Sequence, residues 1–137
     1  IIFRGVLQYF LNPRAYLKKA VGLLKDRGLI FVTAQPNMDS LCHKVYSDKF
    51  TLGPNEFTYT GYTPAILNAE LARLGCHLVG EKFFYEETPY AAPEKDIEEV
   101  RNAILRKNQG MEITTAAPAF WGNMMTLVFQ KTADTYL

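Results

Sequence analysis

The feature that most constrains this chain is a helix, a turn and a strand that follow one another between Asn12 and Asn37, in the stretch NPRAYLKKAVGLLKDRGLIFVTAQPN. An apolar segment, residues 1–7, precedes it with the nearly continuous hydrophobic pattern of a strand covered on both faces. Strand, helix and strand within so few residues predict a right-handed parallel crossover. We therefore expect an α/β fold.

Local signals mark the ends of the first helix. Asn12-Pro13 supplies an N-cap and a proline at the first helical position, and Gly28 is predicted to end the helix as a left-handed residue. A buried strand over 29–34 follows. The residues expected to face the core recur at helical spacing: Tyr16, Leu17, Ala20, Val21 and Leu24.

The rest of the chain continues the alternation of helices and strands. We predict helices over 38–47, from Thr63-Pro64 to Gly75, and over 93–108, with strands over 77–87 and 123–131. Irregular connections are expected over 50–64 and 109–120. The core candidates of the later elements are Ile66, Leu67, Leu71, Leu74, Leu78, Phe83 and Tyr85. A length of 137 residues indicates a single domain, residues 1–137.

Composition argues against several classes of partner. Fifteen basic and fourteen acidic residues leave a formal net charge of +1, which gives no reason to predict a nucleic acid or an anionic membrane as partner. No apolar run has the length of a membrane span, and no leader pattern is visible. With only two cysteines and no leader, a cytoplasmic location is expected.

The two cysteines also bear on metal binding, because each precedes a histidine. A four-ligand site from Cys42-His43 and Cys76-His77 is conceivable, but adjacent residues point in different directions on a helix or strand. Two buried thiols and two surface histidines are the favoured interpretation. No metal is predicted.

The order of these signals resembles a known family. GVLQYFLNPRAYLKKAVGLLKDRGLIFVTAQPN is similar to the second half of class I S-adenosylmethionine-dependent methyltransferases, in which a strand runs into an hLEHh segment, a helix, a glycine turn and a strand ending in Pro-Asn. YTGYTPAILNAELARLG and APAFWGNMMTLVFQK resemble the family's later helix and final strand. The resemblance implies a partial Rossmann-like sheet of about four strands, the first two parallel and the last antiparallel, with helices packed on it.

The sequence departs from the family pattern at three places. Gln8-Tyr9 stands where many relatives have Glu-His, so no histidine base carries over, and the catalytic residue is unknown. Asp26-Arg27-Gly28 replaces the usual Pro-Gly-Gly, and no G-x-G occurs for a cofactor loop. The chain thus resembles the C-terminal part of a methyltransferase domain, beginning at its fourth strand. By itself it is expected to bind S-adenosylmethionine weakly or not at all.

The resemblance also implies a cofactor site, because ligands of open α/β sheets lie outside the carboxyl ends of the strands. The residues that would contact the methionine part of S-adenosylmethionine are Phe3, Arg4, Gly5 and Gln8. Gly5 suits a close backbone approach, and Gln8 suits a hydrogen bond to an amino or carboxylate group. Two alternatives stay open: Arg4 as a plain surface residue, and Gln8 as an exposed helix position.

A small-molecule acceptor is the expected substrate. The candidates for its side of the site are Tyr9, Asn37, Tyr59 and Tyr62. Asn37 is alternatively a cap of the next helix, and the loop aromatics are alternatively buried against their own domain.

Two functions from different classes remain. The first is methyl transfer to a small molecule by a longer protein, with the present chain inactive alone. The second is a non-catalytic α/β module that associates through its first strand. That strand would lie at a sheet edge because its family neighbour is missing, and an open edge is a template for pairing. A homodimer through residues 1–7 is the corresponding prediction.

Overall fold

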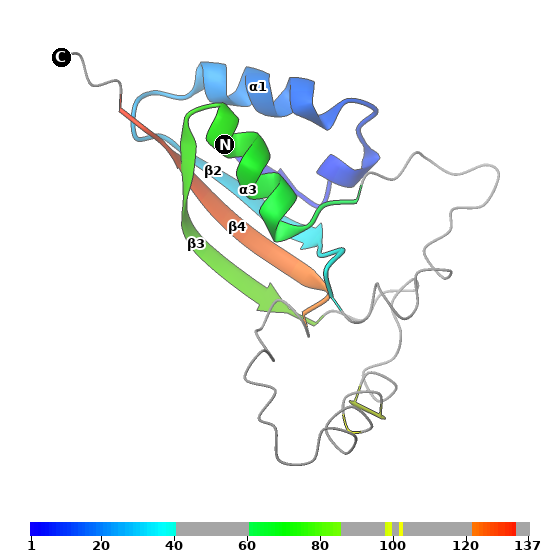
Figure 1. The fold of residues 1–137 in the computed structure, drawn as a ribbon. Coiled ribbons are helices and arrows are strands. Elements are labelled where there is room, and N and C mark those ends of the chain that lie inside the picture. Colours follow the sequence, from blue (N-terminus) through cyan, green and yellow to red (C-terminus); the bar gives the residue numbers. More distant parts are fainter. Residues whose placement is uncertain (41–60, 86–97, 100–101, 103–121, 134–137) are drawn as a thin grey trace.

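A computed structural model describes residues 1–40, 61–85, 98–99, 102 and 122–133 of the chain. Its helices and strands, in chain order, are β1 (Ile2–Arg4), the short 3-10 helix η1 (Leu7–Tyr9), α1 (Pro13–Leu23), β2 (Leu29–Pro36), α3 (Pro64–Arg73), β3 (Cys76–Phe84) and β4 (Met124–Lys131). The strands form one sheet in the order β1-β2-β4-β3 (Figure 1). β1 is parallel to β2, and the other pairs are antiparallel, which confirms the predicted fold class.

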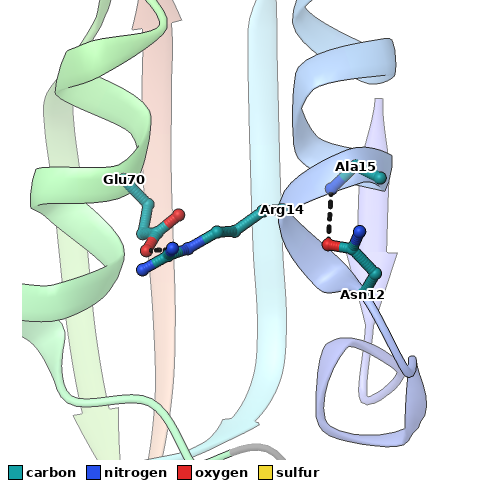
Figure 2. Close-up of polar contacts among 4 residues, drawn as sticks. All are labelled: Asn12, Arg14, Ala15 and Glu70. Carbon is teal, nitrogen blue, oxygen red and sulfur yellow. Dashed lines mark hydrogen bonds and ion pairs between the residues drawn. The ribbon is translucent and has the colours of Figure 1, made fainter.

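Both helices lie on one face of this sheet (Figures 1 and 2). β4 buries every second residue against them, namely Met125, Leu127 and Phe129, while the residues between are half-buried. Burial of each such side chain contributes about 1.5–3 kcal/mol to stability. An ion pair of 2.6 Å between Arg14 Nε of α1 and Glu70 Oε1 of α3 joins the helices (Figure 2).

The predicted helix starts are confirmed. Asn12 Oδ1 accepts a hydrogen bond from the main-chain nitrogen of Ala15 at 3.3 Å (Figure 2), and Thr63 Oγ1 accepts one from that of Ile66 at 3.1 Å. A proline follows each cap, where its missing N–H costs no hydrogen bond. Gly75 ends α3 with a φ of +82°, as predicted.

The end of α1 differs from the prediction. The helix ends at Leu23, and Arg27 rather than Gly28 has the left-handed conformation, with a φ of 62°. The Gly28 nitrogen donates to the Lys25 oxygen at 2.9 Å, which closes a turn. A Cβ on Gly28 would lie 2.8 Å from that same oxygen. Close approach, and not a positive φ, is therefore what requires glycine at position 28.

The first strand is shorter and less covered than predicted. It spans three residues instead of residues 1–7, because Gly5 turns the chain with a φ of 57° and η1 follows. Ile2 is 68% exposed, so the expectation of a strand covered on both faces is wrong. The position of β1 at one edge of the described sheet is as predicted.

Fewer helix residues are buried in the core than predicted. Tyr16 and Ile66 are about half exposed, whereas Leu17, Leu67 and Leu71 are fully buried. The Tyr16 ring stacks on Phe10 at a centroid distance of 4.2 Å instead of entering the core.

A bulge explains the core positions of β3. Leu78 and Phe83 both pack against the core, as predicted, although they are five positions apart and would lie on opposite faces of a regular strand. The register shifts between Leu78 and Gly80, which inserts Val79 and reverses the alternation beyond it. Tyr85, the third predicted core position, is half-buried just after the strand.

Several predicted elements fall wholly or partly outside the described residues. Of the helix predicted over 38–47, only Met38–Ser40 is described, and it forms a turn. Glu98, Glu99 and Asn102 are helical, within the helix predicted over 93–108. The irregular segment 109–120 lies outside. None of the helices described is long and apolar enough to cross a membrane. The single-domain organisation and the cytoplasmic location stay predictions.

Candidate functional site at the carboxyl ends of the parallel strands

The carboxyl ends of β1 and β2 lie next to each other because the two strands are parallel neighbours. The Gly5 nitrogen donates to the Thr33 oxygen at 2.9 Å, and a Cβ on Gly5 would lie 3.5 Å from the Ala34 oxygen. The space beside Gly5 would thus accept a methyl group, but its φ of 57° makes any other residue strained there. Glycine lets the chain turn directly from β1 toward η1.

β2 carries a bulge beside this turn. Val32 pairs with Leu127, but Gln35 pairs with Met125, so β2 has one residue more than β4 over this interval. Ala34 takes a φ of 48° inside the bulge. Because the extra residue shifts the alternation, Gln35 and not Ala34 shares the buried face with Val32.

Two buried glutamines follow from this geometry. Gln8 in η1 is 4% exposed, and its Nε2 donates to the Gly5 oxygen at 3.0 Å, while its Oε1 has no hydrogen-bond partner within the part of the chain that the structure describes. Gln35 is 1% exposed, and within that same part neither its Oε1 nor its Nε2 has a partner. A buried polar group left without a partner costs about 1–3 kcal/mol. Because two such groups lie at one end of the sheet, this end is the candidate site.

Asn37, directly after β2, connects the segments that meet at this end of the sheet. Its Nδ2 donates to the Gly122 oxygen at 3.0 Å, its Oδ1 accepts from the Asp39 nitrogen at 3.0 Å, and its own nitrogen donates to the Asn123 oxygen at 2.8 Å. It also forms an isolated parallel bridge with Tyr62. Asn37 is fully buried, and it joins the ends of β2, β4 and the segment before α3. We call this set of contacts the Asn37 clamp.

Tyr62 is the aromatic residue of the clamp. It is 3% exposed, and its main-chain oxygen accepts a hydrogen bond from the Met38 nitrogen at 3.0 Å. Burial raises the pKa of the Tyr62 phenol above its ordinary value, the Glu70 carboxylate raises it further, and Arg14 opposes the change. The phenol is therefore a neutral hydrogen-bonding group at physiological pH.

The structure groups most of the predicted site residues. Phe3, Arg4, Gly5 and Gln8 share the β1–η1 segment. Phe3 packs against the core and Arg4 is exposed. For Gln8, the alternative of an exposed helix position is wrong, since the side chain is buried. The roles of these four residues in cofactor binding stay predictions.

The substrate candidates are more dispersed. Asn37 and Tyr62 meet in the clamp, whereas Tyr9 is 50% exposed in η1, and Tyr59 lies outside the described residues. Gln35 was not among the predicted residues. The signal that could have found it is an amide side chain in a mostly apolar strand, LIFVTAQP, directly before Pro36-Asn37.

No group of three or more potential metal ligands occurs in the ranges that the structure covers. Cys76 is buried in the core, and burial raises the pKa of its thiol, while Lys131 lowers it. His77 is exposed, with its Nδ1 3.3 Å from Thr132 Oγ1. Cys42 and His43 lie outside the described residues.

The same architecture occurs in solved structures. A chain of the complex between the Haloferax volcanii Trm112 methyltransferase activator and a protein designated a methyltransferase matches with a TM-score of 0.57 and 12% identity, over 99% of this chain and 54% of that chain. A SAM-dependent methyltransferase from Archaeoglobus fulgidus matches with a TM-score of 0.54 and 16% identity, over 95% of this chain and 57% of that one.

A third similar structure is a protein of Galdieria sulphuraria designated a sarcosine dimethylglycine methyltransferase, with a TM-score of 0.52 and 11% identity, over 98% of this chain and 53% of that chain. Neither a scan against protein-family models nor a search of curated proteins gives a match. The chain spans about half the length of the three structures. It has the fold of S-adenosylmethionine-dependent methyltransferases, over a stretch that corresponds to one half of such a domain.

Proposed function

We propose that this chain is the C-terminal, acceptor-side part of an S-adenosylmethionine-dependent methyltransferase that acts on a small molecule, and that it is inactive alone. The fold is one source of support. The observation that carries the proposal is the Oε1 of Gln8, which is buried beside Gly5 at the carboxyl end of β1 and has no hydrogen-bond partner among the residues that the structure describes.

Gln8 suits the methionine part of the cofactor for a chemical reason. Its Nε2 donates to the Gly5 oxygen, which orients the amide, and its Oε1 is the polar side-chain atom that has no partner within the described residues. An ammonium group is the matching donor, and a hydrogen bond from a charged donor is stronger than one between neutral groups. Phe3, Arg4 and Gly5 would form the rest of the binding surface around the methionine part of the cofactor.

S-adenosylmethionine, when bound, supplies a methyl group on a sulfonium for an in-line displacement. The residues of this chain would position the acceptor and exclude water, which is what such a reaction asks of a protein. Asn37 and Tyr62 are buried and bridged to each other in the Asn37 clamp, and we propose that they frame the acceptor side. A small-molecule acceptor is supported by the name of the Galdieria neighbour, which refers to sarcosine and dimethylglycine.

The proposal is tested by calorimetric titration with S-adenosylmethionine. A longer gene product that includes these 137 residues should bind the cofactor, and Gln8→Met should weaken binding about 10-fold or more, since a lost hydrogen bond to a charged group is worth about 1.5–3 kcal/mol. Gln130→Met, the same change at the other end of the sheet, is the control and should leave the affinity unchanged.

Two results would contradict this proposal. Micromolar binding of S-adenosylmethionine by the 137-residue chain alone would contradict the expectation that this part binds the cofactor weakly or not at all. Failure of the longer protein to transfer a labelled methyl group to any component of a small-molecule extract would remove the enzymatic role.

A second candidate function is association through the open edge of β1. Ile1 and Ile2 are 44% and 68% exposed at that edge, an arrangement that invites pairing with another strand. Light scattering should then show a dimer of the 15.6 kDa chain, and Ile2→Lys should convert it to a monomer. Because one neighbour comes from a complex with an activator protein, a monomer that pairs with a different protein would redirect this proposal from a homodimer to a heterologous partner.

A further inference from the structure

Gln35 has a hydrogen-bonding capacity that the described chain does not use. Its side chain is 1% exposed, and within the described residues both of its polar atoms lack partners. The cost of such burial would vanish with an apolar residue of similar shape, as at Met125 directly opposite. A sequence that keeps a buried amide under these conditions is expected to use it for something other than stability.

The position of Gln35 points to a ligand. The β2 bulge turns its side chain to the buried face, at the last residues of the strand, and bulges of this kind commonly redirect a side chain beside a functional site. The segment η1 packs against β2, and it carries Gln8, whose Oε1 also has no partner within the described residues. Two buried amides with free hydrogen-bonding atoms therefore belong to the same end of the sheet.

We infer that Gln35 is a specificity residue for the methyl acceptor and binds a neutral group with a hydrogen-bond donor and an acceptor side by side, such as a carboxamide or the cyclic amide edge of a heterocycle. This inference rests on the proposed function. A glutamine amide presents one acceptor oxygen and one donor nitrogen, so a second amide pairs with it through two parallel hydrogen bonds.

Charged alternatives fit less well. A carboxylate has no donor for Gln35 Oε1, and an ammonium has no acceptor for Nε2–H, so each would leave one atom of Gln35 unpartnered. Each would also bring a charge into a position that is 1% exposed, and burial of an unpaired charge costs far more than burial of an amide. The site should therefore select neutral amides over acids and amines of the same shape.

The test uses three probes of matched shape: benzamide, benzoate and benzylamine. Each is titrated into the ¹⁵N-labelled 137-residue chain, and the side-chain Nε2–H₂ signals of Gln35 are followed by NMR. Their assignment comes from their loss in Gln35→Met. Benzamide should shift these signals with an affinity at least about 10-fold above that of the other two probes, the size expected when one buried hydrogen bond is left unmade.

Two variants separate a ligand-binding role from a structural one. Gln35→Met should abolish the binding of benzamide and raise the Tm by about 4 °C, because it removes an unpartnered amide. Gln130→Met is the control, since the Gln130 amide is used within the chain, where its Nε2 donates to the Arg27 oxygen at 3.1 Å. It should leave benzamide binding unchanged and lower the Tm.

The inference is overturned if benzamide does not move the Gln35 signals, or if all three probes move them with equal affinity. It is also overturned if Gln35→Met lowers the Tm, since the amide would then be satisfied inside the chain or by a buried water. This test requires no cofactor, so its failure is distinct from that of the proposed function. If the chain binds benzamide selectively but the longer protein transfers no methyl group, the amide site at Gln35 is supported and the proposed methyltransferase function is contradicted.

Discussion

The two ends of β2 satisfy their polar groups in different ways. At the amino end, Lys131 Nζ donates to the main-chain oxygens of Val21 at 3.1 Å and Leu24 at 3.0 Å, at the C-terminal end of α1. Gln130 Nε2 donates to the oxygen of Arg27, and the Arg27 nitrogen donates to that of Lys131 at 3.0 Å. Each of these side-chain nitrogens is used to hold the fold.

At the carboxyl end, the same kind of side chain is left without a partner. Gln35 resembles Gln130 in chemistry and lies in the same sheet, yet it is more deeply buried and its side-chain amide makes no hydrogen bond within the described residues. The contrast teaches that side-chain nitrogens at one end of the sheet hold the fold together, whereas a buried amide at the other end carries an energetic cost, which our proposal assigns to ligand binding. The predictions below test that division.

The largest effect is expected at Lys131. Lys131→Met removes two hydrogen bonds from a charged donor to the end of α1, and it should lower the free energy of unfolding by about 2 kcal/mol. Urea unfolding measures the change. Lys25→Met, at an exposed lysine in the same turn, is the matched control and should stay within about 0.5 kcal/mol. Equal losses of stability in Lys131→Met and Lys25→Met would show that the hydrogen bonds of Lys131 do not hold the amino end of β2.

The two glutamines should respond with opposite signs to the same substitution. Gln130→Met should lower the free energy of unfolding by about 1 kcal/mol, because the Arg27 oxygen loses its donor, whereas Gln35→Met should raise it by a similar amount. Parallel urea titrations of the two variants and the parent chain suffice. If both substitutions lower the free energy of unfolding, the amides at the two ends of β2 both stabilise the fold and the contrast between them is wrong.

A smaller effect is expected from backbone strain, which occurs once at each end. Arg27 and Ala34 have φ angles of 62° and 48°, a region that costs residues other than glycine about 1–2 kcal/mol. Since glycine also loses more entropy on folding, Arg27→Gly and Ala34→Gly should each stabilise the chain by about 0.5 kcal/mol. Only Ala34→Gly should weaken benzamide binding, because it alone relaxes the bulge that orients Gln35. A loss of binding in Arg27→Gly would contradict this.

The smallest effect concerns Tyr62 and appears only at alkaline pH. Burial, and then the Glu70 carboxylate, raise the pKa of Tyr62 above its ordinary value of 10.0, so the folded chain holds the phenol proton more tightly than the unfolded chain. The resulting stability is fully present below pH 10 and is lost as the pH rises through the higher pKa of the folded state. Tyr62→Phe should reduce this alkaline loss. Urea unfolding of the parent and of Tyr62→Phe at pH 6, 8 and 10.5 checks this prediction. The difference in stability between the two chains should be the same at pH 6 and pH 8 and should change at pH 10.5.

Local signals predicted the parts of the fold that depend on neighbouring residues. The starts of α1 and α3 require only a capping oxygen and a proline, all within three residues, so Asn12 and Thr63 could be identified directly. The parallel pairing of β1 and β2 follows from a short helical connection. Gly75 was predicted correctly because its left-handed conformation closes a helix at its own position.

The remainder depends on distant parts of the chain. The C-terminus of α1 is bound by a lysine 110 residues away, and the bulge that turns Gln35 inward arises from the register between β2 and β4. Neither can be inferred from the residues around Gln35 or Gly28. The sequence analysis therefore named Gln8, Asn37 and Tyr62, which lie near the carboxyl ends of the parallel strands, but it did not name Gln35.

The Asn37 clamp has a consequence for how such a chain can change over evolution. The interval that leaves at Ser40 returns at Gly61, beside the Asn37–Tyr62 bridge, and the interval that leaves after β3 returns at Gly122, where a Cβ would lie 2.7 Å from the Phe84 nitrogen. Both intervals thus start and finish at the same end of the sheet, at residues held by the contacts just described. Doubling the length of such a connection costs only about 0.6 kcal/mol, so insertions there can alter what is recognised without disturbing the register of the sheet.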